Sequence, residues 1–162
     1  MRILIIIAVV CLPVVGHAQS IGEVTKLPIP RFVSLRGDKV YARTGPGTRY
    51  PVKWIYQRKN LPVEIVNEFD TWRKVRDVDG EEGWIHQSLL SGKRYVSVNE
   101  KSSIPLYQDH NDAARVVALV ESESILRVNE CDDGWCFLSR AGYEGWIAYN
   151  SLWAIYEGEQ IE

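Results

Sequence analysis

The sequence predicts an all-β protein with two small antiparallel β-barrels in tandem after a signal peptide. Short segments alternate between apolar and polar residues, and Gly, Pro and Asp turn signals separate them at close intervals. A unit of about 60 residues occurs twice. Hydrophobic residues make up 46% of the chain and charged residues 25%, which is typical of a folded globular protein. Many short strands without a long helix favour a small barrel or sandwich.

The first 18 residues have the pattern of a secretory signal peptide. Arg2 gives a positive start, residues 3–15 are almost wholly apolar, and Gly16 and Ala18 are the small residues that a signal peptidase reads. We therefore expect cleavage between Ala18 and Gln19. The apolar run is shorter than the roughly 20 residues of a membrane-spanning helix, and a retained anchor is the alternative. The pattern predicts an exported protein, periplasmic or secreted, with no stable membrane span after cleavage.

A loose internal repeat divides the rest of the chain. After a predicted linker over residues 19–30, "RFVSL" recurs as "RYVSV", "VNEFDTW" as "VNECDDGW", and "EGWIHQSLL" as "EGWIAYNSLW". The order is the same and the offset stays at 62 or 63 residues. We expect a first barrel over residues 31–91, a second over residues 92–156, and a C-terminal tail over residues 157–162.

Each unit divides into short predicted strands. In the first unit these cover residues 40–43, 52–54, 63–65, 72–76 and 83–85, with Asp79-Gly80 as the turn of a hairpin. The segment "NDAARVVALVESE" (residues 111–123) has helical spacing, but its position in the repeat and its β-branched valines favour a strand. A barrel of this size has a small core, so docking of the two units is expected to support both.

Two cysteines remain after the signal peptide, Cys131 and Cys136. An even number in an exported chain predicts a disulfide, here across a turn made by residues 132–135. The alternative is half of a zinc site, but no second cysteine pair is present. We expect no metal and no other cofactor.

The charge pattern and the residue inventory exclude several classes of function. The net charge of −2 gives no case for nucleic acid, although residues 31–91 carry 11 basic against 8 acidic residues and residues 92–162 carry 6 against 12. Catalysis needs a nucleophile, a base and a group that orients them. Beyond the signal peptide the only histidines, His86 and His110, lie in different units, and the cysteines are expected to be paired. We predict that the protein is not an enzyme.

The stretch "YARTGPGTRYPVKW" (residues 41–54) is a turn or a binding loop. It lacks the Gly-Lys-Ser/Thr sequence and the following helix of a phosphate-binding loop. Pro46 fixes one backbone dihedral, and Gly45 and Gly47 tolerate positive φ angles. Alternation with Val40 and Ala42 inward places Tyr41 and Arg43 outward.

The first unit resembles the bacterial type of Src-homology-3-like (SH3-like) domain. The resemblance rests on "VYARTGPGTRYPV", on "VEI", on a following tryptophan and on "GEEGWIHQSLL". The second unit is degenerate, because "LYQDHNDAARV" replaces the Arg-x-Gly-Pro loop. The resemblance implies SH3-like antiparallel barrels and a binding role, often towards cell-wall peptidoglycan or its peptide stems. The alternative is a periplasmic protein–protein adaptor whose partner is an envelope protein.

The candidate ligand-binding residues all belong to the first unit. Arg can fork onto a carboxylate and flat aromatic rings can stack on sugars or peptide planes. In eukaryotic relatives the peptide groove contains a tryptophan that Trp72 overlays and a proline that His86 overlays. For the three tryptophans the alternative is a place in the barrel core, and for Tyr41 and Arg43 it is a solvated strand face. The candidates are Tyr41, Arg43, Arg49, Tyr50, Trp54, Trp72, Trp84 and His86.

Overall fold

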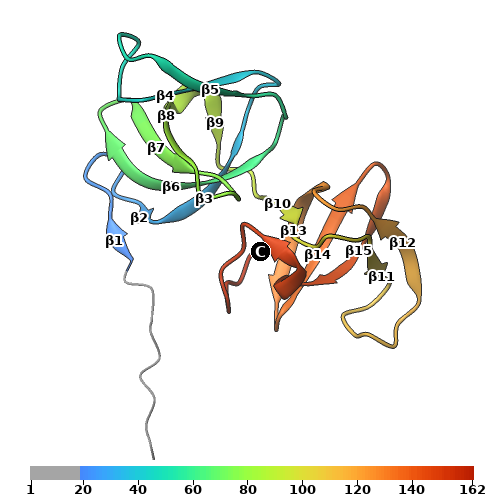
Figure 1. Cartoon of the computed structure of the whole chain (residues 1–162). Helices are drawn as coiled ribbons and strands as arrows, with labels where there is room; N and C mark the ends of the chain where they lie inside the picture. The colour runs from blue at the N-terminus through green and yellow to red at the C-terminus, as the bar shows by residue number, and fades with distance from the viewer. Residues whose placement is uncertain (1–18) are drawn as a thin grey trace, which may run out of the picture.

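Two antiparallel seven-stranded sheets form most of the computed structural model, which describes residues 19–162. Each sheet curls into a small barrel, and the two barrels lie side by side (Figure 1). The prediction of an all-β chain with two units in tandem is confirmed. The predicted signal peptide, with Ala18, lies outside the described residues, and Gln19 is the first residue inside them. Within residues 19–162 no helix is long and apolar enough to cross a membrane.

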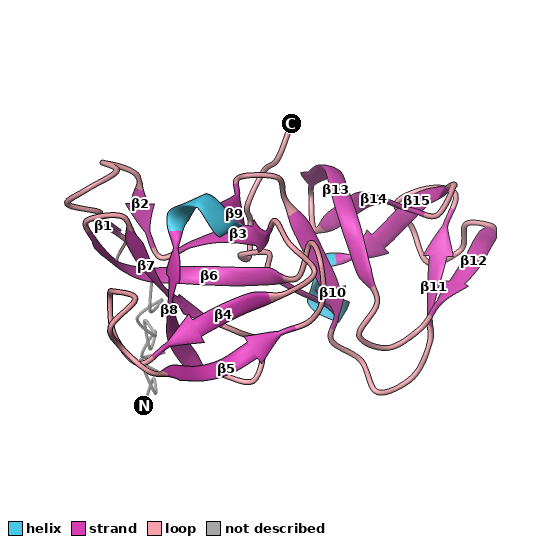
Figure 2. Cartoon of the chain, turned by 90° about the horizontal axis from the view of Figure 1, so that it is seen from above, coloured by secondary structure: helices cyan, strands magenta, loops and turns pink. Residues whose placement is uncertain are grey.

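The first barrel has the strand order β5-β4-β8-β7-β6-β3-β9. Its core follows from the period-2 alternation of the strands, since Val40, Ala42, Val63, Val75 and Ile85 are all fully buried. The 3₁₀ turn η1 (Gln87–Leu89) links β8 to β9 (Figure 2). The strands are β3 (Arg31–Leu35), β4 (Val40–Arg43), β5 (Val52–Tyr56), β6 (Pro62–Phe69), β7 (Trp72–Arg76), β8 (Glu82–His86) and β9 (Leu90–Ser91).

The second barrel repeats this order as β12-β11-β15-β14-β13-β10-β16. In the segment of residues 111–123, for which the sequence favoured a strand over a helix, residues 116–120 form a strand as predicted. Residues 111–115 lie in the loop before it. Its 3₁₀ turn, η2 (Tyr149–Ser151), matches η1. The strands are β10 (Tyr95–Val98), β11 (Ile104–Tyr107), β12 (Val116–Val120), β13 (Ile125–Asp132), β14 (Trp135–Arg140), β15 (Tyr143–Ala148) and β16 (Leu152–Trp153).

The two barrels fasten the same hairpin in different ways. In the second barrel Cys131 and Cys136 are cross-strand partners on β13 and β14, and the predicted disulfide joins them. The register-equivalent partners in the first barrel are Glu68 and Arg73 on β6 and β7. Their side chains are 1% and 4% exposed, and Arg73 Nε lies 3.7 Å from Glu68 Oε1. A buried ion pair therefore occupies the place that the disulfide takes in the repeat.

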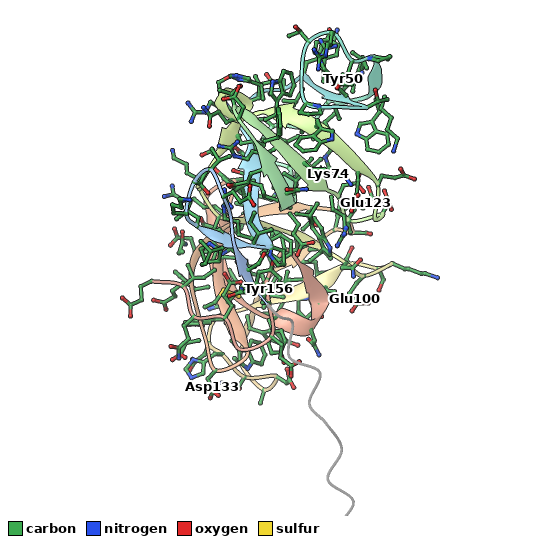
Figure 3. All side chains as sticks on the ribbon, turned by 90° about the vertical axis from the view of Figure 1, so that its left-hand side faces the viewer. Tyr50, Lys74, Glu100, Glu123, Asp133 and Tyr156 are labelled. Carbon is green, nitrogen blue, oxygen red and sulfur yellow. A yellow bond between two sulfur atoms is a disulfide. The ribbon has the colours of Figure 1, made fainter. Side chains whose placement is uncertain are left out.

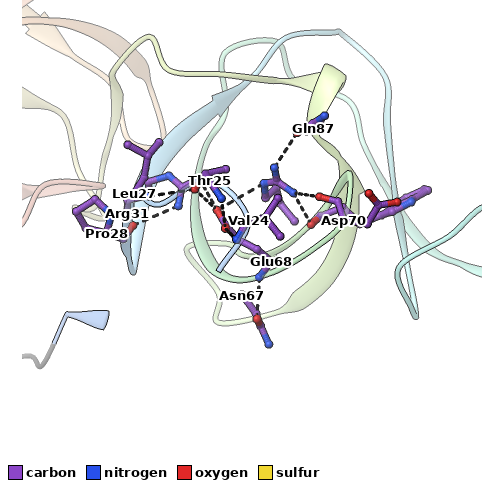
Figure 4. A network of polar contacts seen from close by, with 11 residues as sticks. Val24, Thr25, Leu27, Pro28, Arg31, Asn67, Glu68, Asp70 and Gln87 are labelled. Atoms are coloured by element: carbon purple, nitrogen blue, oxygen red, sulfur yellow. Dashed lines mark hydrogen bonds and ion pairs between the residues drawn. The ribbon is translucent and has the colours of Figure 1, made fainter. Parts of the chain in front are cut away.

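Residues 19–30, which the sequence predicts to be a linker, instead form a hairpin on the first barrel. Its strands are β1 (Ser20–Ile21) and β2 (Pro28–Ile29). Figure 4 shows the reason: the Glu68 carboxylate accepts hydrogen bonds from the backbone N–H groups of Val24 and Thr25, the Thr25 hydroxyl and Arg31. A buried carboxylate needs such partners, and Val24 and Thr25 of the hairpin supply them together with Arg31 of β3.

The hydrogen bonds to Glu68 also set its ionisation. Burial opposes the charged form, but the hydroxyl and N–H of Thr25 and the guanidinium of Arg31 outweigh it and lower the pKa of Glu68 to about 2. The carboxylate therefore remains charged at every pH at which the barrel is expected to function.

The C-terminal tail also pairs with its barrel. Ile161 forms an antiparallel bridge with Cys131, with N–H···O distances of 2.9 and 3.1 Å between the two backbones. In each barrel a terminal segment thus contacts the residue that cross-links the central hairpin. The N-terminal hairpin contacts Glu68 of the ion pair, and residue 161 pairs with Cys131 of the disulfide.

Aromatic side chains fill the contact between the barrels. The Phe32 ring lies 5.3 Å from that of Trp153 and 4.6 Å from that of Tyr156. The Tyr156 hydroxyl donates a hydrogen bond of 2.8 Å to Glu64, and Figure 3 shows Tyr156 between the barrels. Burial, with the Glu64 carboxylate as the next cause, raises the pKa of Tyr156 well above its usual range. These contacts couple the units, as the small size of each core leads us to expect.

Candidate functional site

The outer surface of β4, β8, β7 and β6 brings several candidate residues together. Cross-strand neighbours share a face of a sheet, and the inward positions of these strands are the buried core residues. The outward positions pair Arg43 with Trp84, Trp84 with Lys74, and Trp72 with both His86 and Phe69. We call this set the first-barrel face, and it consists of Arg43, Phe69, Trp72, Lys74, Trp84 and His86.

Arg43 stands opposite Trp84 at the edge of this face, beside the loop of residues 44–50. Its Nη1 donates hydrogen bonds to the carbonyls of Thr48 and Tyr50, at 3.1 and 2.7 Å. Within residues 19–162 Arg43 forms no ion pair. The guanidinium therefore anchors the loop through Nη1.

Gly45 of the loop is needed for close packing, and neither Gly45 nor Gly47 has a positive φ angle. Positive φ among glycines of the described chain occurs at positions 80, 134, 142 and 158, so Gly45 and Gly47 do not use the positive φ angles that they tolerate. A Cβ on Gly45 would lie 2.5–2.7 Å from ring atoms of Tyr50. The Tyr50 ring lies against the loop backbone, and Arg49 lies over that ring at 5.1 Å. The loop projects from the end of the first barrel away from the second (Figures 1 and 3).

Trp72 and His86 form the second row of the face. Their rings meet edge to face at 5.4 Å. His86 Nδ1 lies 2.8 Å from the Ser88 hydroxyl and caps η1, so this imidazole is held within its own turn. Phe69, the neighbour of Trp72 on β6, is 59% exposed. The row is a solvent-accessible aromatic surface.

The buried Arg73 supports this row from below. It donates to the carbonyls of Asp70 and Trp72 at 2.8 Å and to the Gln87 side chain at 2.7 Å (Figure 4). Arg73 also pairs with Glu68, which holds the N-terminal hairpin. The Glu68–Arg73 ion pair and the backbone that carries Trp72 therefore belong to one polar network.

Carboxylates neutralise part of the positive charge on the face. Lys74 and Arg76 both bind Glu82, at 2.5 and 2.7 Å, and these hydrogen bonds lower the pKa of Glu82. Arg76 also reaches Glu64 at 3.5 Å. Arg43 and Arg49 have no such partner within residues 19–162, so they are the cations that remain available at this end of the barrel.

The other candidates lie off the first-barrel face. Tyr41 is 39% exposed on the outward side of β4, opposite Ile55. Trp54 packs against the core, meets Tyr56 edge to face at 6.1 Å, and has Lys53 over its ring at 4.3 Å. The alternative of a core position thus holds for Trp54, whereas Trp72 and Trp84 point outward.

Sequence reasoning missed two members of the face, Lys74 and Phe69. The alternation of β7 was a usable signal for Lys74, because Trp72, Lys74 and Arg76 share one side. Phe69 required the register of β6 against β7, which a bulge between Ile65 and Asn67 shifts.

Some cavities lie away from the face. One of about 770 Å³ lies between the Cys131–Cys136 hairpin and residues 155–160, and one of about 490 Å³ lies between the barrels. No group of three or more potential metal ligands occurs within residues 19–162.

The comparison with protein families agrees with this architecture. The family model described as the bacterial SH3 domain matches residues 36–92 and 100–154, once for each barrel. The search of curated proteins gives no match. Two solved structures from Trichomonas vaginalis are similar: NlpC2 (17% identity, TM-score 0.35, covering 76% of this chain and 47% of that one) and NlpC1 (16%, 0.34, 82% and 49%). The chain spans about half the length of these two proteins.

Proposed function

The chain belongs to the bacterial SH3 domain family, and from this membership we propose that it is an exported, non-catalytic module that binds cell-wall peptidoglycan through its peptide stems. The observation that carries the proposal is the pair of Arg43 and Trp84 on the first-barrel face. The Arg43 guanidinium, which pairs with no carboxylate within residues 19–162, lies beside a flat aromatic surface and so suits a peptide that ends in a carboxylate. Arg49, on the same loop, adds a second cation.

Two further observations support a non-catalytic, exported protein. Cys131 and Cys136 are bonded to each other, so neither supplies a free thiolate. His86 is occupied by Ser88 within its own turn. Disulfides are typical of oxidising compartments such as the bacterial periplasm, which agrees with the predicted signal peptide.

The first test is sedimentation with purified peptidoglycan at low salt. We expect the protein to enter the pellet and to leave it as salt is raised, because exposed cations act through screened charge. Protein that stays in the supernatant at low salt contradicts the proposal.

The second test locates the site. The probe is an acetylated alanyl dipeptide with a free carboxylate, which contains no amine. We expect Trp84→Ala to weaken binding about tenfold, and the matched variant Trp146→Ala, at the equivalent position of the second barrel, to bind as the wild type. Equal affinity of the Trp84→Ala variant and the wild type would exclude this face.

A second candidate is an adaptor between envelope proteins. The aromatic contact between the barrels favours it, because Phe32, Trp153 and Tyr156 join the units into one larger surface. Affinity capture from cell envelopes should then recover one stoichiometric partner, and the yield should fall for Phe32→Ala. Recovery of no partner would count against the adaptor.

A further inference from the structure

The second barrel carries a strip of four aromatic side chains on the surface that corresponds to the first-barrel face. Trp146 is the cross-strand neighbour of Tyr107 and of Phe137, and Trp135 lies one row further along β14. The Phe137 and Trp146 rings are 5.3 Å apart, and those of Tyr107 and Trp135 6.0 Å. All four are half-buried, while the inward residues between them, Cys136, Leu138 and Ile147, are fully buried. The strip therefore lies on the outside of the barrel.

Carboxylates flank this strip on β13. Glu130 is the cross-strand partner of Phe137, and Asp132 is that of Trp135. Both acidic residues are exposed, and neither forms an ion pair within residues 19–162. Asp132 accepts hydrogen bonds only from the Asp133 backbone and from Gln160 among these residues. Arg127, on the same strand, lies opposite Ser139 and not opposite Phe137.

The other end of the strip is also acidic. His110 lies against Trp146 at 5.2 Å between ring centroids, and its Nδ1 is 2.8 Å from Asp109. Both side chains are about 60% exposed. Carboxylates thus border the aromatic surface on two sides.

Comparison of the two barrels shows that the corresponding surface changes from basic to acidic, although no single position exchanges a cation for an anion. The tryptophans are retained, because Trp135 and Trp146 take the places of Trp72 and Trp84. Arg43 and Lys74 are replaced by Tyr107 and Phe137. The neutral positions Asn67 and Phe69 of β6 are replaced by the acidic Glu130 and Asp132 on β13. Residues 92–162, the second unit with the C-terminal tail, carry twice as many acidic as basic residues.

We propose that this strip binds a cationic amine, such as the protonated side chain of a lysine in a peptide. The ammonium group lies over an indole ring of Trp135 or Trp146, where the negative face of the ring attracts it, and pairs with Glu130 or Asp132. The alkyl stem of the amine rests on Phe137 and Tyr107. The inference is independent of the function proposed for the first barrel, because the two sites share no residue and prefer opposite charges.

The test is a titration followed through the indole N–H resonances in two-dimensional NMR, with each signal assigned by a Trp→Phe variant. The probe is a blocked tripeptide with one central lysine, and the controls are the same peptide with an acetylated lysine and with glutamate. We expect saturable shifts of the Trp135 and Trp146 signals with the lysine peptide alone, and unchanged signals for Trp72 and Trp84.

A pair of double variants separates a local site from general charge attraction. Glu130→Gln with Asp132→Asn should weaken binding of the lysine peptide about tenfold. Glu100→Gln with Glu121→Gln removes the same charge near the opposite end of β11 and β12 from Tyr107, and should change affinity by less than about twofold.

Three results would overturn the proposal. These are equal shifts with the acetylated or glutamate peptide, no shift at millimolar lysine peptide, or equal weakening by the two double variants.

Discussion

The buried carboxylate of Glu68 allows a prediction whose size follows from the structure. Its pKa is about 2 in the folded protein, against 4.5 as its ordinary value. One pKa unit corresponds to about 1.4 kcal/mol, so the ionised carboxylate contributes about 3 kcal/mol of stability. Because the folded pKa is the lower one, this contribution is complete above the ordinary value. It disappears as the pH falls from about 4.5 towards 2.

The perturbation is Glu68→Gln, which keeps the shape of the side chain and removes its charge. At neutral pH we expect the free energy of unfolding to fall by about 3 kcal/mol, because Arg31 and Arg73 lose their common partner. As the pH is lowered, the wild type should approach the variant and meet it near pH 2. Urea unfolding followed by tryptophan fluorescence at a series of pH values measures both proteins.

The control is Glu81→Gln, which removes an exposed carboxylate paired with Lys53 at 3.5 Å. A surface pair of this kind contributes less than about 1 kcal/mol. The reasoning is refuted if the difference between wild type and Glu68→Gln stays constant with pH, because a charged, hydrogen-bonded carboxylate would then not be its cause. A loss no larger than that of Glu81→Gln at neutral pH would refute it equally.

Three other predictions concern the loop, the disulfide and the contact between the barrels. Gly45→Ala should displace the Tyr50 ring and cost about 1–3 kcal/mol, whereas Gly92→Ala, with no atom within 4 Å of the added Cβ, should be nearly neutral; thermal unfolding compares the two. Replacement of Cys131 and Cys136 by serine should lower the free energy of unfolding by about 2 kcal/mol, measured by urea unfolding, and an unchanged midpoint would contradict a stabilising bridge. Tyr156→Phe should cost about 1–3 kcal/mol, because it leaves the Glu64 carboxylate without its 2.8 Å donor; calorimetry of this variant beside Tyr143→Phe, at an exposed position, measures it.

The fold could be predicted from the sequence because its signals are local. Alternating residues such as Val40 to Arg43 define strands, and Asp133-Gly134, at positive φ in the structure, defines a tight turn. The repeat then transferred these assignments from one unit to the other. It also decided the segment before Val120, where helical spacing and β-branched residues disagreed.

The candidate site was harder to predict because it depends on contacts between distant residues. Thr25 and Glu68 are 43 positions apart, so nothing in residues 19–30 alone indicates a hairpin fastened by a buried carboxylate. The neighbours of Trp84, Arg43 and Lys74, become visible only with the strand register. Gly45 was assigned a dihedral role because the nearness of the Tyr50 ring is not written in the local sequence. Ligand binding by any of these residues stays a prediction.

The two barrels share one strand order but carry different side chains at equivalent positions. At the inward positions 68 and 73 an ion pair fastens the hairpin, and at 131 and 136 a disulfide does. On the outward positions, cations and neutral residues around two tryptophans become aromatic and acidic residues around the equivalent two. Because side chains alternate between core and solvent, such a face can reverse its charge without changing the packing beneath it. The second unit, which lacks the Arg-x-Gly-Pro loop, therefore keeps the barrel and changes the chemistry of its surface. Experiments on the function of the second barrel should start from that surface.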